Sequence, residues 1–365
     1  MSQQVLDAVV GHLRLESEIG GYAAAAASAD KVEATYESIA AMLGCGRHEV
    51  ALSDSSTRSW MSAVHALPLG PDDRVVTTRA QYGSNAIALL QLQRRTGFLL
   101  DVVDDDADGQ VDLHALAEAL ARPKVALMSL THVPTQSGLV NPAAAVGRLC
   151  RDAGVVFALD ACQAAGQMPL DVSELGCHIL AGTGRKFLRG PRGTGFLYVE
   201  ESLSERLEPP VIDMFGATWV APDRYELRPA ARRFELWESD VAARIGLGVA
   251  VQEALGLGLH EIASCTASMA RSLRCRLDEV PRVSVQDRGA ELCAIVTFTV
   301  DGIRAEEVVA RLRSENARVS AAVATSAQLD LPPRGLDAVV RASVHYLTTD
   351  EELDRFTHLL RAIVG

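Results

Sequence analysis

One lysine stands out by its surroundings. Lys186 lies in TGRKFLRGPRGTGF (183–196), directly after the apolar run HILAG (178–182), and the only other lysines are Lys31 and Lys124. Arginine does not lose its proton in a protein, whereas lysine can, and the neutral amine is both a nucleophile and a base. We therefore predict that Lys186 is a catalytic residue that forms a Schiff base. The alternative is an ordinary solvated basic loop.

A carboxylate and an amide precede this lysine. Asp160 ends the apolar run VVFALD (155–160), and Gln163 follows in the next turn. Ligands of parallel sheets bind beyond the carboxyl ends of the strands, so we expect Asp160 and Lys186 to face one crevice. A carboxylate there can hold a cationic ring nitrogen, and Gln163 can bond a second atom of the ring. The alternative for Asp160 is a helix-capping carboxylate.

Hydroxyl side chains before a predicted helix suggest an anion site. The segment SDSSTRSW (53–60) places Ser56 and Thr57 at a helix N-terminus, where backbone N–H groups and the helix dipole favour a phosphate. Thr183 and Arg185, beside the lysine, would add a hydroxyl and a positive charge. The alternative for this segment is a plain capping box.

An aromatic residue completes the set. Tyr82, in QYGSN (81–85), opens another predicted helix and could stack on a flat ring, although packing is its alternative role. The order of phosphate loop, stacking aromatic, Asp160, Gln163 and Lys186 has one economical explanation, namely a phosphorylated aromatic aldehyde bound as an imine. These residues predict pyridoxal 5′-phosphate as the cofactor and imply no metal.

In this order the motifs resemble the class V aminotransferase family of fold type I pyridoxal-phosphate enzymes, which includes cysteine desulfurases and isopenicillin-N-epimerase-like proteins. The resemblance runs from about residue 5 to the end. It implies that Lys186 carries the cofactor, that Asp160 keeps the pyridine nitrogen protonated and that Gln163 contacts the ring hydroxyl. It also implies a homodimer and further cofactor contacts, from Ser56, Thr57, Tyr82, Thr135, Thr183 and Arg185.

The same resemblance suggests substrate-binding residues. Arg341, in VRASVHYLTTDEEL, matches the family's arginine that grips the substrate carboxylate, with a surface ion pair as its alternative. Tyr22, in EIGGYAAA, could form a wall of the pocket. His132 is a further substrate-side candidate, with a structural histidine at a strand end as its alternative.

The sequence also departs from the desulfurases, which need a nucleophilic cysteine shortly before that arginine; here no cysteine follows Cys293. The stretches GGY, HVPTQSGLVNP, GRKFLRGPRGTGF and RFELWE resemble carbon–sulfur lyases of the ergothioneine-biosynthesis type. The resemblance implies a β-lyase that cleaves a cysteine S-conjugate or its sulfoxide to release pyruvate and ammonia. The alternatives are an isopenicillin-N-type epimerase using Tyr22, Tyr82 or His132 as second base, an aminotransferase or desulfurase-like member, and a binding module without catalysis.

These residues need an α/β scaffold to bring them together. From about residue 30 to 200, seven strand-like runs alternate with helix-like runs (48–53, 74–78, 98–104, 124–130, 155–160, 178–182 and 193–199). Short, continuously apolar strands separated by helices predict a mostly parallel sheet covered on both faces. We predict an N-terminal arm and large cofactor-binding domain over 1–244, and a smaller α+β domain over 245–365.

Composition narrows the function classes. A net charge of −12 and a pI of about 5.3 argue against binding to nucleic acid or an anionic membrane. The 7 cysteines form no C-x-x-C pair, so neither a zinc ribbon nor a disulfide scaffold is expected, and reduced thiols in a cytoplasmic protein are the simplest account. No apolar run is long enough for a membrane span.

Overall fold

The structure is a computed structural model that describes residues 1–365. Its strands are β1 (Val50–Ser53), β2 (Arg74–Thr78), β3 (Leu99–Val103), β4 (Val125–Thr131), β5 (Val156–Asp160), β6 (Ile179–Thr183), β7 (Gly195–Val199), β8 (Ala217–Ala221), β9 (Arg224–Leu227), β10 (Val283–Val285), β11 (Ile295–Val300), β12 (Ser320–Val323) and β13 (Ala338–Ser343). Its α-helices are α1 (Gln3–Ile19), α2 (Gly21–Ala27), α3 (Ala29–Leu43), α4 (Ser56–Val64), α5 (Gly83–Thr96), α6 (Leu113–Leu120), α7 (Ala143–Ala153), α8 (Val172–Leu175), α9 (Glu201–Ser204), α10 (Val241–Leu257), α11 (Leu259–Asp278), α12 (Ala305–Ser314) and α13 (Asp350–Val364).

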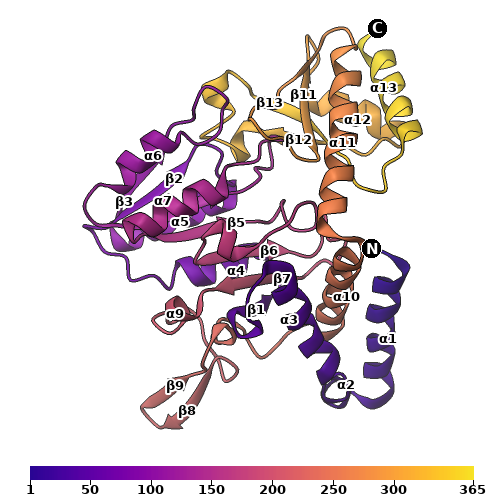
Figure 1. Ribbon diagram of the computed structural model, residues 1–365. Helices are drawn as coiled ribbons and strands as arrows, with labels where there is room; N and C mark the ends of the chain where they lie inside the picture. The colour runs from indigo at the N-terminus through magenta and orange to yellow at the C-terminus, as the bar shows by residue number, and fades with distance from the viewer.

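A seven-stranded sheet forms the centre of the molecule (Figure 1), in the order β1-β7-β6-β5-β4-β2-β3. Strand β7 is antiparallel to both of its neighbours, and the other six strands run in one direction. The seven predicted runs correspond to β1–β7. The predicted mostly parallel sheet covered by helices is therefore confirmed, with β7 as the one reversed strand.

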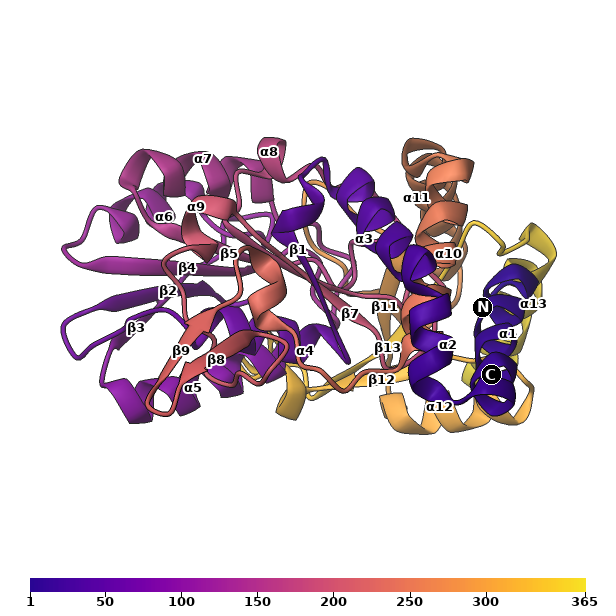
Figure 2. The ribbon, with the colours of Figure 1, turned by 90° about the horizontal axis from the view of Figure 1, so that it is seen from below.

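Both faces of this sheet are buried, which explains why its strands are apolar throughout. In β5, Phe157 and Leu159 belong to the core on one face, and Ala158 belongs to the core on the other. Figure 2 shows α6, α7 and α8 on one side of the sheet and α4 and α5 on the other. Side chains alternate between faces along a strand, so a strand covered on both sides needs apolar residues at every position.

A second, four-stranded antiparallel sheet follows in the order β10-β11-β13-β12, with α11, α12 and α13 packed around it (Figure 1). The boundary predicted between residues 244 and 245 falls inside α10, which packs against α1 and α3, and this division stays a prediction. No single helix has the length and apolar character that a membrane span requires; α10 and α11 pass that test only as a pair, and they are bent by 80° at their junction.

The loop after β4 joins the two sheets. Within it, Gly138 O accepts a hydrogen bond from Cys293 N (2.8 Å), and Gly138 N donates to Asp287 Oδ1 (2.9 Å). Asp287 also forms a buried ion pair with Arg274 (2.8 Å). A Cβ on Gly138 would lie 2.4 Å from Ile295 O, so only glycine allows this approach. The loop that carries Thr135 is consequently fixed against the second sheet.

Two acidic side chains meet where the loops after β3 and β12 approach each other. Asp330 is 7% exposed and accepts hydrogen bonds from Gln136 Nε2 (3.0 Å) and Arg334 Nη1 (3.4 Å). Asp105 Oδ1 is buried without a hydrogen-bond partner. Burial, and to a smaller extent the charge of Asp330, raise the pKa of Asp105 from 3.8 to about 6.

We expect Asp105→Asn to stabilise the protein at pH 7 and to have little effect at pH 4. Because the folded-state pKa of Asp105 is raised, the stability that its protonated form provides is lost as pH rises from about 4 to about 6. The gain at pH 7 should be about 1 kcal/mol, since water partly screens this half-buried group. Urea denaturation at both pH values tests it, with exposed Asp108→Asn as the control. An equal effect at both pH values would contradict this account.

Candidate active site

The strand register brings the predicted site residues to one edge of the large sheet. Asp160 is paired with Thr131 of β4 and with Ala181 of β6, and Thr183 of β6 is paired with Gly195 of β7. Strands β4, β5 and β6 are parallel, so their carboxyl ends meet there. This is the edge at which open α/β sheets bind ligands.

One glycine allows the loop before α4 to reach this edge. Gly195 lies opposite Ser53 in the register, and a Cβ on Gly195 would lie 2.3 Å from the carbonyl carbon of Ser55. Ser55 is the N-cap of α4 and accepts a hydrogen bond from Arg58 N (3.3 Å). The first backbone N–H groups of the helix, at Ser56 and its neighbour, therefore stay available for an anion.

These elements enclose a small polar cavity with a volume of about 60 Å³. It contains seven of the predicted site residues. Its full lining is Asp54, Ser55, Ser56, Thr57, Tyr82, Asn85, Asp160, Cys162, Thr183, Arg185, Lys186, Gly193 and Thr194. The structure has no group of three or more His, Cys, Asp or Glu side chains that could hold a metal ion.

Lys186 projects into the cavity from a tight turn after β6. The turn is closed by hydrogen bonds from Gly190 N to Gly184 O (2.7 Å) and from Arg189 N to Lys186 O (2.9 Å). Lys186 Nζ lies 6.0 Å from the centroid of the Tyr82 ring. It forms no ion pair with an acidic side chain, so its amine is free to contact a ligand.

The Gln163 amide links the lysine to two residues outside the cavity lining. With its oxygen turned toward the donors around it, Gln163 accepts hydrogen bonds from Lys186 Nζ (3.1 Å), Thr135 Oγ1 (3.2 Å) and Arg341 Nη1 (3.2 Å). Gln163 is 3% exposed, and its position is therefore well defined by packing. The structure thus brings Thr135, Gln163 and Arg341 to the same site as Lys186.

Arg341 is a cation without an anionic partner. It lies on β13, and its Nε donates to Ser343 Oγ (3.2 Å), while no acidic side chain pairs with it. Burial lowers the pKa of Arg341. An unpaired charge in a partly buried position is costly, which indicates that this guanidinium is placed to receive an anion from outside the chain.

Asp160 is almost fully buried and accepts two hydrogen bonds. Its Oδ2 accepts from Asn85 Nδ2 (2.7 Å), and its Oδ1 accepts from Cys162 N (2.9 Å). Burial raises the pKa of Asp160, whereas the Cys162 N–H, the charge of Lys186 and the Asn85 amide oppose that rise. Asn85 was not predicted as a site residue. The sequence signal for it was its position three residues after Tyr82, in the first turn of α5, which Tyr82 precedes as N-cap.

Two further predicted site residues lie outside the cavity lining, and a third residue lines the cavity with its hydroxyl already hydrogen-bonded. Tyr22 lies on α2, is 87% exposed and does not line the cavity. His132 also lies outside the cavity lining; it is buried, and burial lowers its pKa to about 4, so the imidazole is neutral at pH 7. Thr183 lines the cavity, but its hydroxyl already donates to Thr194 O (2.9 Å).

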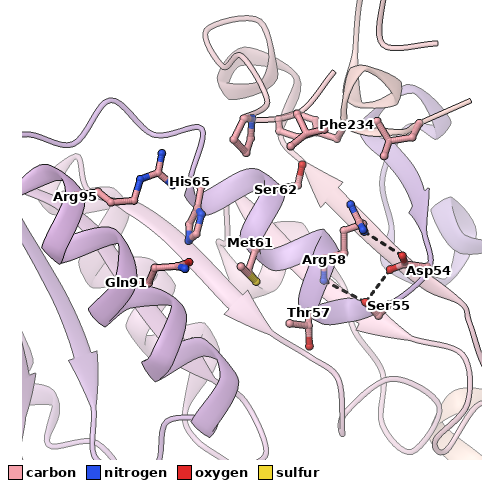
Figure 3. Close-up of a pocket in the computed structure, with 13 residues that line it drawn as sticks. Asp54, Ser55, Thr57, Arg58, Met61, Ser62, His65, Gln91, Arg95 and Phe234 are labelled. Carbon is pink, nitrogen blue, oxygen red and sulfur yellow. Dashed lines mark hydrogen bonds and ion pairs between the residues drawn. The ribbon is translucent and has the colours of Figure 1, made fainter. Parts of the chain in front are cut away.

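A larger cavity of about 580 Å³ lies beside the first one (Figure 3). Figure 3 shows Met61 of α4, His65 directly after that helix and Gln91 of α5, together with Phe234. The two cavities share Asp54, Ser55 and Thr57. Lys186 and Asp160 do not line the larger cavity. The smaller cavity is therefore the candidate active site.

The comparisons with known proteins agree with this geometry. The family model described as aminotransferase class-V matches residues 1–356. A probable hercynylcysteine sulfoxide lyase of Mycobacterium tuberculosis is 32% identical, over 98% of this chain and 86% of that protein. A probable cysteine desulfurase of Methanothermobacter thermautotrophicus is 26% identical, over 95% of this chain and 87% of the relative. A solved C-DES structure, with glycine covalently linked to its pyridoxal phosphate cofactor, has a TM-score of 0.89 and 22% identity, and covers 99% of this chain and 93% of C-DES.

The chain belongs to the class V aminotransferase family, and its cofactor is pyridoxal 5′-phosphate. The cavity residues fit that group. The α4 N-terminus and Arg185 provide donors and positive charge for a phosphate, buried Asp160 suits a cationic ring nitrogen, and Lys186 offers a free amine. The predicted family, fold type and cofactor are thus confirmed.

Proposed function

We propose that this chain is a carbon–sulfur β-lyase that cleaves a cysteine S-conjugate or its sulfoxide and releases pyruvate and ammonia, as in ergothioneine biosynthesis. The observation that carries the proposal is the link from the Lys186 amine through Gln163 to Arg341, a partly buried cation without an acidic partner. This arrangement suits the α-carboxylate of an amino acid next to a base. The sulfoxide lyase named among the relatives supports the proposed substrate class.

The cofactor would be held by the residues predicted for it. Ser56, Thr57, Thr183 and Arg185 would surround its phosphate, and Asp160 would pair with its ring nitrogen. Tyr82 would stack on the ring, and Gln163 and Thr135 would contact the ring hydroxyl. When bound, pyridoxal phosphate supplies an electron sink that makes the α-proton of an amino acid acidic.

The protein side chains would then decide which bond breaks. Arg341 would hold the substrate carboxylate through its planar fork, which fixes the α-carbon relative to Lys186. Lys186 Nζ would take up the α-proton, and the sulfur substituent would leave with the electron pair of the carbon–sulfur bond. Gln163, which contacts both Lys186 and Arg341, would keep the spacing of these two side chains constant.

Cysteine placement supports a lyase over a persulfide-forming desulfurase. Of the seven free cysteines, Cys162 alone lines the cavity, and burial raises the pKa of its thiol. The loop between β12 and β13 contains no cysteine, although it approaches the site: a Cβ on Gly83 would lie 2.6 Å from Ser326 O. An epimerase would need a second base, and neutral His132 lies outside the cavity lining.

A panel of S-substituted cysteines and their sulfoxides would test the proposed function. The holoenzyme should release pyruvate and ammonia in equal amounts from at least one conjugate. Absence of pyruvate from every conjugate would count against elimination. Exchange of solvent deuterium into the α-position with loss of optical rotation, and without pyruvate, would favour epimerisation instead.

We further propose a homodimer, and a reducing compartment such as the cytoplasm, which the free cysteines support. The β8–β9 hairpin projects from the body of the molecule (Figure 1) and exposes Trp219 (76%). Met214 (80%) and Trp237 (57%), on neighbouring segments, are also exposed. A lone chain rarely leaves so many large apolar side chains in water, which supports an interface on this side.

The Trp219→Glu variant should shift the protein toward monomer, because a charge in an apolar interface has no partner. Light scattering after gel filtration should give twice 39.0 kDa for the wild type and a lower mass for the variant. Leu99→Glu, on a different part of the surface, is the matched control and should remain dimeric. A wild type that elutes as a monomer would overturn the dimer, and a fully dimeric Trp219→Glu variant would remove the hairpin from the interface.

A further inference from the structure

The carboxylate of Asp160 occupies an unfavourable position for a charge. It is 4% exposed, and its burial favours the neutral form. The charge of Lys186 and two hydrogen bonds oppose this effect. A neutral carboxylic acid could not balance a cationic ring nitrogen, so the cofactor site needs this group to be ionised.

Asn85 is the side chain that bonds this carboxylate most closely. Its Nδ2 lies 2.7 Å from Asp160 Oδ2, and no other side chain donates a hydrogen bond to Asp160. The second hydrogen bond comes from the backbone N–H of Cys162, and a side-chain substitution does not remove this donor. Hydrogen bonds to an ionised acceptor are about twice as strong as neutral ones, so they favour the ionised form.

A buried polar network fixes the Asn85 amide in turn. Gln81 Oε1 accepts from Asn85 Nδ2 (3.4 Å), from Thr131 Oγ1 (2.6 Å) and from Tyr82 N (2.9 Å). Gln81 Nε2 donates to Thr77 Oγ1 (2.8 Å). Asn85 and Gln81 are each 2% exposed. The amide therefore has one orientation available, with its N–H group directed at the carboxylate.

We propose that Asn85 is a positioning residue that keeps Asp160 ionised and directs its carboxylate into the cavity. Asn85 acts through Asp160 and takes no part in proton transfer. The inference deepens the proposed function, on which it rests for the cofactor site, and it concerns cofactor binding rather than the bond that is cleaved. It connects the β2–α5 loop, which carries Tyr82, with the end of β5.

A double-mutant cycle on cofactor affinity tests this inference. The dissociation constant of pyridoxal phosphate is measured by fluorescence titration of the apo-protein for wild type, Asn85→Leu, Asp160→Asn and the double variant. Asn85→Leu should weaken binding about 10- to 100-fold in the wild-type background, because the ionised form of Asp160 loses its one side-chain hydrogen bond. In the Asp160→Asn background, Asn85→Leu should weaken cofactor binding less than about 3-fold, because residue 160 then carries no charge for Asn85 to stabilise.

Gln91→Leu provides the matched control, since it replaces an exposed amide on the same helix and should leave affinity unchanged. Urea denaturation of each apo-protein separates loss of folding from loss of affinity. An equal loss of affinity in both backgrounds would show a merely structural role and overturn the inference, as would a loss below about 3-fold in the wild-type background. If the cycle gives the expected coupling and no conjugate yields pyruvate, the proposed lyase reaction fails while the role of Asn85 stands.

Discussion

The variant Lys186→Ala should release pyruvate from the best conjugate at least about 10⁴-fold more slowly than the wild type. Loss of a positioned base alone costs about 10²- to 10⁴-fold, and the variant also lacks the amine that attaches the cofactor. Lys186→Arg should be about as inactive, since a guanidinium keeps its proton at pH 7. Steady-state pyruvate assays on cofactor-saturated protein measure both effects.

The chain offers a matched control for this prediction. Lys124 is exposed and pairs with Asp72 on the surface (2.8 Å), so Lys124→Ala should retain activity within about twofold. The account would be contradicted if Lys186→Ala kept more than about a tenth of the wild-type rate. It would also be contradicted if Lys124→Ala were as inactive as Lys186→Ala, because that would indicate a general loss of folding.

The second large effect is expected at Arg341. The Arg341→Met variant should lower kcat/KM about 10²- to 10³-fold, mainly through KM, because a bidentate contact to the substrate carboxylate is lost. Arg341→Lys should be intermediate, since it keeps the charge without the planar fork. The affinity for pyridoxal phosphate should change little, because Arg341 does not line the cavity beside Lys186.

The Arg341→Met variant should be more stable than the wild type, although it is less active. Arg341 has no acidic partner and burial lowers its pKa, so removal of the charge should raise the free energy of unfolding of the apo-protein by roughly 1 kcal/mol. Arg313→Met, on the exposed side of α12, is the control and should alter neither property. A variant that loses activity together with stability would indicate a structural role for Arg341, contrary to the proposal.

The strands of the large sheet were predictable because a sheet covered on both faces requires continuous apolar runs, such as HILAG at 178–182. The reversed direction of β7 was not predictable, because a buried strand has the same composition in either direction. The β8–β9 hairpin was also missed. It exposes Trp219 and Tyr225, so the usual alternation of apolar and polar residues is absent.

The candidate site was predictable to the extent that strand ends coincide in space. Asp160 and the turn with Lys186 follow neighbouring parallel strands, which brings them together. The hydrogen bond of Gln163 with Arg341, by contrast, joins segments 178 residues apart and depends on how the two sheets pack. Asn85 was overlooked because an asparagine in the first turn of a helix usually has a local capping role.

The most direct test of the central claim uses the fact that the chain has only three lysines. The purified holoenzyme should absorb visible light as a yellow protein, and borohydride should remove that absorbance and fix the cofactor to the chain. Peptide mass mapping should then find the reduced pyridoxal phosphate on the peptide that contains Lys186. Attachment at Lys31 or Lys124, or a colourless protein that takes up no added cofactor, would contradict the account.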